Sequence, residues 1–392
     1  MLSSIMLDRW DFQGYIRELQ RQGLYRRIID REGPQGRIIK IRGVEVVNFS
    51  SNDYLGLCND RALIDRAISA VKTHGVGAGA SRLLSGGTEL HRELESIISE
   101  FKGTEMTILF NSGYAANTGA IAALCDRDTV VFSDELNHAS IIDGCRLSRG
   151  EVIVYRHADT GHLRELIKKH PDKKRIIITD SVFSMDGDIA PIRDIVKLAG
   201  EFDCLLYLDE AHSTGVLGEG RGVLHHYNIK PEPFIIQMGT LSKALGSVGA
   251  FVTGREEIID FLINRARSLI YSTALPAHAV AVSIEAIRMI QRDKERIKRL
   301  WQNREHLVSG LKELGLDIGS SETPIIPVIV PDNERAIRLS EFLFRKGFYA
   351  PPVRVPTVKI PRIRLTVTAV HEEEDIGGLI SALKGARDCG LL

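Results

Sequence analysis

The sequence predicts an α/β fold: a large domain with a mainly parallel, seven-stranded sheet, and a smaller α/β domain at the C-terminus. From about residue 60 onward, short apolar runs rich in β-branched residues alternate with amphipathic helical stretches. Such alternation is typical of βαβ units, in which helices cover both faces of a parallel sheet. The expected strands are 107–110, 129–132, 152–155, 175–179, 205–208, 234–238 and 248–252.

The chain before this sheet is predicted to contain a helix and a hairpin. Apolar side chains recur at roughly helical spacing in residues 8–31, which favours an opening helix. Two β-branched runs, 38–41 and 44–49, flank Arg42-Gly43 and therefore predict a hairpin. We expect three parts: an N-terminal segment 1–59, a large domain 60–285 and a small domain 286–392.

The small domain is predicted from its own succession of patterns. Residues 277–310 form a long, charge-laced run with helical spacing, so we expect a helix there that bridges the two domains. Beyond it, the patterns predict a strand at 325–330, a helix at 335–346, a strand at 363–367 and a closing helix at 372–387.

Composition narrows the class of partner. The 51 basic and 51 acidic side chains leave no excess positive charge to hold a nucleic acid or an anionic membrane, so we expect small-molecule substrates. No stretch of 18 apolar residues occurs, which predicts a cytoplasmic protein without a membrane span. Five scattered cysteines without a C-x-x-C pair predict free thiols and no structural metal site.

A lysine among small and hydroxyl residues directly follows an expected strand, in Gly239-Thr-Leu-Ser-Lys-Ala-Leu-Gly246. Ligands of parallel sheets usually lie beyond the carboxyl ends of the strands, so Lys243 is placed to project into a binding crevice. Its amine becomes a nucleophile or base once burial or cationic neighbours lower its pKa. Taken alone, the pattern is more typical of a solvated loop lysine.

Asp209 and His212 follow the expected strand 205–208 in the same way. A carboxylate in this place can pair with a protonated ring nitrogen of a cofactor and keep the ring cationic, so that it withdraws electrons from a substrate carbanion. Standing alone, the stretch leaves other interpretations open. Asp209 and Glu210 would also suit a metal site or a helix N-cap, and His212 would suit the core.

Two further turns carry side chains or amides that suit a phosphorylated aromatic ring. In residues 110–117, a strand runs into Ser112-Gly113 and an Ala-rich helix start, where unpaired backbone amides favour an anion. Tyr114 and His138 add flat side chains that can stack on a heteroaromatic ring. Each signal is weak by itself, and the order of all four along the chain is what gives them weight.

In that order the motifs resemble those of fold type I transferases that use pyridoxal 5′-phosphate (PLP), and specifically the α-oxoamine synthases. The resemblance covers nearly the whole chain. It rests further on the segments 48–56, 79–87 with His91, 137–140, 182–188 and 271–276.

The resemblance implies roles for individual residues. Lys243 would bond to PLP and move the α-proton of the substrate, and Asp209 would bind the pyridinium nitrogen. His212 and Ser184 would contact the phenolic oxygen, and His138 would stack on the ring. The implied catalytic residues are Lys243, His138, Asp209 and His212. The implied phosphate ligands are the amides of Gly113 and Tyr114, the hydroxyls of Thr240 and Ser242, and Thr273 of a second subunit, which makes a homodimer with shared sites the expected form.

The same resemblance suggests a substrate pair. Arg364 matches an arginine that holds the amino-acid carboxylate in a bidentate fork. The same pattern also fits a solvated arginine at the start of a strand. Residues 350–358 resemble those of the family member that joins L-alanine to a pimeloyl thioester in biotin biosynthesis and releases CO2 and the thiol. The implied substrate-binding residues are Arg26, Asn52, Arg354, Thr357 and Arg364.

The sequence leaves the acyl carrier open between coenzyme A and an acyl carrier protein. It also departs from the family pattern at three places: a short loop 359–361, Val355 in place of a proline, and Asp180 in place of a glutamate. The competing activity is that of glycine C-acetyltransferase, which uses glycine and acetyl-CoA. A catalytically inactive PLP-fold binding module is the non-enzyme alternative, and retention of all four catalytic residues argues against it.

Overall fold

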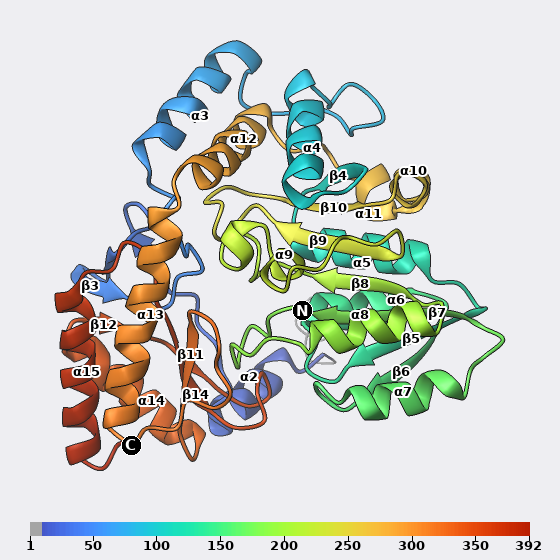
Figure 1. Ribbon diagram of the computed structural model, residues 1–392. Helices are drawn as coiled ribbons and strands as arrows, with labels where there is room; N and C mark the ends of the chain where they lie inside the picture. Colours follow the sequence, from blue (N-terminus) through green and yellow to red (C-terminus); the bar gives the residue numbers. More distant parts are fainter. Residues whose placement is uncertain (1–9) are drawn as a thin grey trace, which may run out of the picture.

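The computed structural model describes residues 10–392, and its centre is a seven-stranded sheet (Figure 1). The strand order is β4-β10-β9-β8-β7-β5-β6, in which β10 is antiparallel to both neighbours and the pairs from β9 to β6 are parallel. All seven expected strands are confirmed. They are β4 (Met106–Phe110), β5 (Thr129–Asp134), β6 (Glu151–Tyr155), β7 (Lys174–Asp180), β8 (Leu205–Asp209), β9 (Ile235–Thr240) and β10 (Ala250–Gly254).

Helices pack on both faces of this sheet (Figure 1). Because successive side chains of a strand point to opposite faces, Ile177 of β7 joins one buried apolar cluster while Ile176 and Ile178 join another. The helices of this part are α3 (Arg61–His74), α4 (Glu89–Lys102), α5 (Gly113–Leu124), α6 (Ala139–Leu147), α7 (Thr160–Lys168), α8 (Ile192–Glu201), the short η1 (Gly218–Gly220) and α9 (Val223–His226), α10 (Glu256–Arg265) and α11 (Arg267–Ile270).

The expected helix 277–310 is two helices, α12 (Ala277–Arg292) and α13 (Glu295–Glu313), so the prediction of one continuous helix was wrong. The break lies at Asp293, whose backbone is extended (φ −117°, ψ 100°) and whose carboxylate accepts the Glu295 amide at 2.9 Å. An aspartate side chain that accepts a hydrogen bond from a nearby backbone amide in this way competes with helix continuation. The two helices lead from the large sheet to the C-terminal part of the chain (Figure 1).

The C-terminal part contains the expected strands and helices. A three-stranded sheet has the order β11-β14-β13, and a second sheet of order β1-β2-β3-β12 joins the N-terminal hairpin to residues near 348. The proposed domain boundaries at 59/60 and 285/286 stay predictions. The elements are β1 (Arg31–Glu32), β2 (Ile38–Ile41), β3 (Val44–Asn48), β11 (Ile325–Ile329), α14 (Asn333–Arg345), β12 (Phe348–Tyr349), β13 (Pro352–Val353), β14 (Arg362–Thr366) and α15 (Glu373–Asp388).

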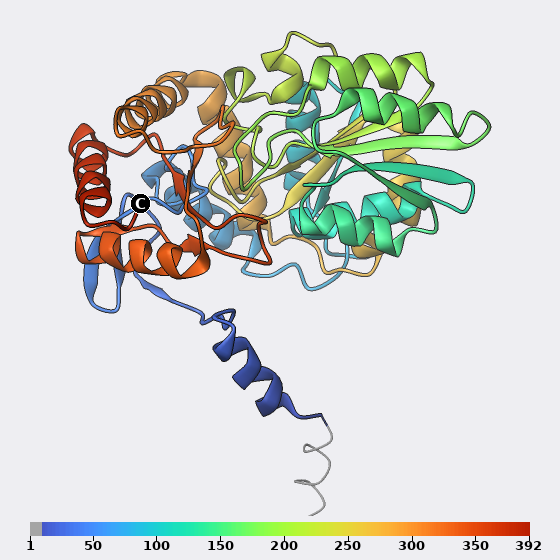
Figure 2. The ribbon, with the colours of Figure 1, turned by 90° about the horizontal axis from the view of Figure 1, so that it is seen from below.

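The opening helix is shorter than expected. Helix α2 (Phe12–Arg21) ends before Gly23, whose positive φ of 67° is a left-handed conformation that glycine adopts at little cost. Residues 8 and 9 of the expected helix lie outside the described part. Figure 2 shows α2 projecting away from the body of the protein, and none of its residues is buried.

No helix within residues 10–392 is long and apolar enough to cross a membrane.

A buried ion pair fixes the turn that follows β8. The ammonium of Lys102, at the end of α4, contacts the Glu210 carboxylate, and both side chains have no exposed surface. The Lys102 ammonium also donates to the Thr214 hydroxyl at 3.1 Å and to the Arg221 carbonyl at 2.7 Å. Glu210 in turn accepts the Val223 amide at 2.8 Å. The residue next to Asp209 is therefore held from several sides.

Replacing Lys102 by methionine is expected to lower the free energy of unfolding by about 3–5 kcal/mol, because it leaves the Glu210 charge buried without a partner. Lys174→Met is the matched control, since Lys174 pairs with Asp126 at 2.8 Å on the exposed surface and should cost less than about 1 kcal/mol. Urea unfolding of both variants measures the difference. Equal losses would contradict a special role for the buried pair.

Candidate active site

Two acidic side chains lie side by side at the carboxyl ends of neighbouring parallel strands. Asp180 ends β7, Asp209 ends β8, and their Cα atoms are register partners in the sheet. Both residues are buried. Burial and the nearby Asp209 carboxylate raise the pKa of Asp180 well above its ordinary value. Groups from α5, from the start of α6 and from the turn after β9 lie around this pair of acids.

Asp209 is held from two directions. Its Oδ2 accepts a hydrogen bond from the Asn117 side-chain amide at 2.8 Å, and its Oδ1 accepts the Ala211 backbone amide at 2.8 Å. Asn117, on α5, also donates to the Ser140 hydroxyl at 2.8 Å and accepts from the Tyr207 hydroxyl at 3.0 Å. Asn117 lies inside the 110–117 motif, but nothing in the sequence marked it as the partner of Asp209.

Lys243 reaches the same place from the turn after β9. Its Nζ lies 3.0 Å from Nε2 of His212, whose Nδ1 lies 2.7 Å from the Tyr54 hydroxyl. Burial lowers the pKa of Lys243 to about 8, with a further lowering by the Arg364 charge, while the nearby aspartates oppose the shift. Burial and the Lys243 charge also hold the pKa of His212 well below its ordinary value, so this ring is neutral beside the amine.

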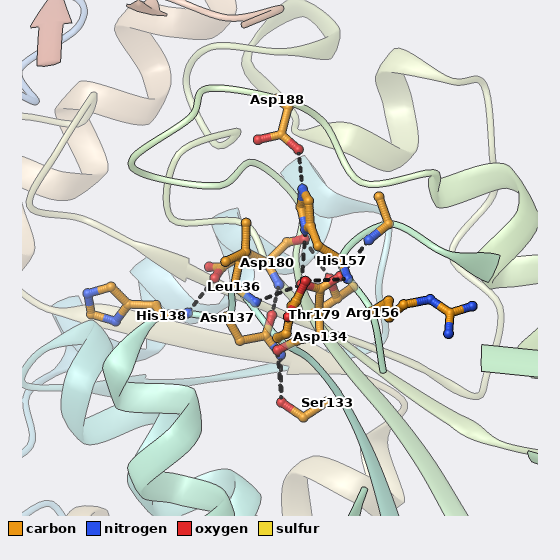
Figure 3. A network of polar contacts seen from close by, with 12 residues as sticks. Ser133, Asp134, Leu136, Asn137, His138, Arg156, His157, Thr179, Asp180 and Asp188 are labelled. Carbon is orange, nitrogen blue, oxygen red and sulfur yellow. Dashed lines mark hydrogen bonds and ion pairs between the residues drawn. The ribbon is translucent and has the colours of Figure 1, made fainter. Parts of the chain in front are cut away.

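His138 caps the start of α6 beside the two acids. Its backbone amide donates to Asp180 at 2.7 Å, as Figure 3 shows, and its Nδ1 lies 2.7 Å from the Ser140 hydroxyl. Burial, with a contribution from the Lys243 charge, lowers the pKa of His138. The ring orientation is therefore fixed by Ser140, which is itself bound to Asn117, the partner of Asp209.

The predicted phosphate turn has the geometry of an anion cradle. Gly113 is the first residue of α5, and a Cβ at this position would come within 2.7 Å of the Thr240 methyl group, so only glycine fits. The free amides at a helix start attract an anion. Of the other predicted phosphate ligands, Ser242 is exposed and lies two residues after Thr240 in the chain. The Thr273 carbonyl accepts a hydrogen bond from the Asn111 side-chain amide at 2.7 Å. The Tyr114 ring is 49% exposed, and its hydroxyl donates to the Asp143 carboxylate.

The substrate-side residues form two groups. Arg364 is buried on β14 and donates to Asn52 Oδ1 at 3.1 Å, to Thr366 Oγ1 at 3.0 Å and to the Ser184 carbonyl, so that Arg364, Asn52 and Ser184 come together. Arg26 and Arg354 form the other group, together with the loop hydroxyl of Thr357. Arg26 donates to Thr357 Oγ1 at 3.2 Å, and Arg354 donates to a backbone carbonyl of the N-terminal segment.

The described residues fit PLP. Gly113 begins α5, whose first backbone amides can bind a phosphate. Asp209 offers a carboxylate whose position is fixed, and Lys243 offers an amine whose pKa is about 8. These features and the seven-stranded sheet define a fold type I PLP-dependent transferase.

Comparison with known proteins agrees with this class. Residues 44–383 match the family described as aminotransferase class I and II, and the chain belongs to that family. A protein of Thermodesulfovibrio yellowstonii is 53% identical over 95% of this chain and 96% of its own length. The 8-amino-7-oxononanoate synthase of Thermoanaerobacter pseudethanolicus is 47% identical over 94% of each chain.

A solved structure extends the comparison. The serine palmitoyltransferase of S. paucimobilis, determined with a bound PLP–myriocin adduct, superimposes with a TM-score of 0.92 at 28% identity, covering 98% of this chain and 99% of that one. The predicted fold class, the cofactor PLP and the membership of the α-oxoamine synthases are thereby confirmed. The individual residue roles stay predictions.

The lowered pKa of Lys243 predicts how its amine reacts. Only the unprotonated amine is nucleophilic, so acylation of Lys243 in cofactor-free protein should accelerate as the pH rises, with a midpoint of about 8. Lys174 is the internal control, because hydrogen bonding to Asp126 raises its pKa above the ordinary value. Acetic anhydride labelling followed by mass spectrometry of the peptides measures both. A midpoint for Lys243 at or above that of Lys174 would contradict the assignment.

Proposed function

We propose that this protein condenses L-alanine with a pimeloyl thioester to give 8-amino-7-oxononanoate, CO2 and a free thiol, a step of biotin biosynthesis. The observation that carries the proposal is the meeting of Lys243 and His212 at 3.0 Å beside Asp209, which Asn117 holds. The identity of 47% to a named 8-amino-7-oxononanoate synthase over nearly the full length supports the choice of substrates.

The reaction needs a proton to leave and return at one carbon atom. When bound, PLP supplies an electron sink that stabilises negative charge on the α-carbon of the amino acid. Lys243 is the residue that would hold PLP and then move the α-proton, because an amine with a pKa of about 8 can both take and return a proton near neutral pH. Asp209 would keep the cofactor's ring nitrogen protonated through its charge.

Arg364 would hold the amino-acid carboxylate. Its buried guanidinium already donates to Asn52 and Ser184 at the edge of the site, and a planar guanidinium suits a bidentate carboxylate contact. The Ser184 hydroxyl and His212 would meet the phenolic oxygen of PLP, and His138 would stack on its ring. Ordered in this way, the α-proton of the amino acid would face Lys243.

The group of Arg26, Arg354 and Thr357 would recognise the far end of the acyl chain. A pimeloyl group ends in a carboxylate or its ester. The Arg26 guanidinium on the Thr357 hydroxyl, with the Arg354 guanidinium on the Gly23 carbonyl, suits such an end. An acetyl group has no such end. This is why we favour a pimeloyl donor, carried by coenzyme A or by an acyl carrier protein, over the acetyl donor of glycine C-acetyltransferase.

A homodimer with shared sites is part of the proposal. Large apolar side chains are exposed in the two segments that carry Ser81 and the predicted phosphate ligand Thr273: Leu84 is 80% exposed, Val76 73% and Tyr271 71%. Ser81 forms an isolated bridge with Thr273, which ties these segments together. Exposed apolar side chains that gather beside a site favour burial by another subunit.

The five free cysteines are in keeping with a cytoplasmic location.

The proposed activity is tested by supplying purified, PLP-loaded protein with two substrate pairs. We expect CO2 release and thiol formation with L-alanine and pimeloyl-CoA, and much slower turnover with glycine and acetyl-CoA. Lys243→Ala should abolish turnover while the far-ultraviolet circular dichroism stays unchanged, because the proposed proton carrier is lost. Faster turnover with glycine and acetyl-CoA, or wild-type activity of the variant, would contradict the proposal.

Replacing Arg354 by alanine is expected to raise the KM for the pimeloyl thioester about tenfold or more, since a hydrogen bond to a charged group contributes about 1.5–3 kcal/mol. The KM for L-alanine should change little, because that substrate is assigned to Arg364. Steady-state kinetics with each substrate varied in turn give both constants. Arg338→Ala, on the exposed face of α14, is the matched control, and an equal effect of both variants would count against the assigned acyl pocket.

A further inference from the structure

His157 lies outside every motif discussed so far, yet it occupies the centre of a polar network (Figure 3). The residue follows β6, and its side chain is 22% exposed. Its Nδ1 lies 3.0 Å from Asp134 Oδ1, and its Nε2 lies 2.9 Å from Asp188 Oδ2. The ring also packs edge-on against Phe183, with centroids 4.4 Å apart. One imidazole thus joins the end of β5 to the segment 182–188.

Each of the two segments carries a residue of the proposed cofactor site. Asp134 begins the turn that leads to His138, and it shapes this turn by accepting the Leu136 amide at 2.9 Å. Asp188 ends the segment that contains Ser184, and its carbonyl accepts the Phe183 amide at 3.1 Å. His157 is therefore the bridge between the turn that places the stacking ring and the segment that places the contact to the phenolic oxygen.

The other side of the segment 182–188 is held by the C-terminal part of the chain. Arg364 donates to the Ser184 carbonyl, and Arg362 contacts both Asp186 and the Met185 carbonyl. His157 is the counterpart on the large-sheet side. Within residues 10–392, Asp188 Oδ1 has no hydrogen-bond partner, so His157 supplies the one side-chain contact that the Asp188 carboxylate makes.

The charge of the ring follows from its neighbours. Burial alone would lower the pKa of His157, but hydrogen bonds to Asp134 and Asp188 outweigh burial and raise it to about 10. At neutral pH the ring is therefore a cation that donates to one carboxylate on each side. Glu135 also faces this region, accepting the His157 backbone amide at 3.3 Å, and its carboxylate pairs with Lys359 at 3.3 Å.

We infer that His157 is a positioning residue for the reaction: clamped between Asp134 and Asp188, it sets the separation of His138 and Ser184 around the cofactor. It touches neither cofactor nor substrate and acts through the two segments that it joins. This inference rests on the proposed function for the identity of the cofactor contacts. The clamp itself rests on the contacts of His157 alone.

The decisive comparison is between His157→Gln and His157→Arg in the PLP-loaded protein. Glutamine keeps one donor but removes the charge, whereas arginine keeps the charge and can donate to two carboxylates. We expect His157→Gln to weaken PLP binding and to raise the KM for L-alanine, each by about tenfold or more, because small displacements of positioned groups cost large factors. We expect His157→Arg to retain most of the PLP affinity and to bring the KM for L-alanine back close to the wild-type value. His306→Gln, the same change at an exposed histidine of α13, is the control and should resemble wild type.

The pH dependence adds a readout that a purely space-filling role would not move. Because the pKa of His157 is raised when folded, its stabilising effect is full below the unfolded pKa of about 6.5 and is lost as the pH rises through about 10. The difference in unfolding free energy between wild type and His157→Gln should therefore shrink from neutral pH to above pH 10.

The outcomes separate the two proposals. PLP affinity is measured by equilibrium dialysis and needs no acyl substrate, so it tests the clamp even if the substrate pair is wrong. Unchanged PLP affinity and KM in His157→Gln would overturn the inference, as would a stability difference that does not vary with pH. Failure of wild-type protein to turn over L-alanine with pimeloyl-CoA would overturn the proposed function and leave the clamp standing.

Discussion

The buried carboxylates of Asp180 and Asp209 are the constraint on which the rest of the site depends. Parallel strands in register bring both to the same sheet edge, where burial removes the water that would stabilise their charges. Donors and a cation must therefore gather around them. Asn117 and the His138 amide supply hydrogen bonds, and the Lys243 amine supplies nearby positive charge. The chemistry of the site follows from how these acids are compensated.

Burial shifts the pKa of the Lys243 amine and of the His212 imidazole beside it in the same direction, although the two acids oppose the shift of Lys243. Burial disfavours the charged forms of both Lys243 and His212, so the pKa of each is lowered. Tyr54, also buried, has its pKa raised to about 12 and stays a neutral partner of His212. A neutral imidazole between a phenol and an amine can accept a hydrogen bond on one side and donate on the other.

Much of the fold could be predicted from the sequence, because its strands are short β-branched runs bounded by turns, and such runs are local signals. The break between α12 and α13 could not be predicted, because no glycine or proline stands beside Asp293. This residue ends the helix through its contact with the Glu295 amide. The strands β9 and β10 were predicted to begin slightly early. In β10 the strand starts only after Gly249, whose φ of 108° is incompatible with a strand.

The site was predictable to the extent that its residues follow strands. Lys243, Asp209 and His212 stand in sequence motifs that end strands, and the structure brings them together as expected. The sequence did not reveal Tyr54 as the partner of His212, or His157 as the partner of Asp134 and Asp188. Tyr54 contacts a residue 158 positions away, and His157 contacts carboxylates 23 and 31 positions away. Ordinary residue types at such separations leave no local pattern, so three-dimensional contacts are needed to reveal them.

If Arg364 holds the amino-acid carboxylate as proposed, it would link the binding of substrate to the pKa of Lys243. Its charge lowers the pKa of Lys243 in the absence of an anion, and its guanidinium is the group assigned to the amino-acid carboxylate. A carboxylate bound there would offset the positive charge and so reduce the lowering that Arg364 exerts on the pKa of Lys243. A less depressed pKa would make the amine a stronger base when an α-proton has to be removed. The same arginine contacts the Ser184 carbonyl, so the segment 182–188 is held at Ser184 by the proposed substrate-binding residue and at Asp188 by His157.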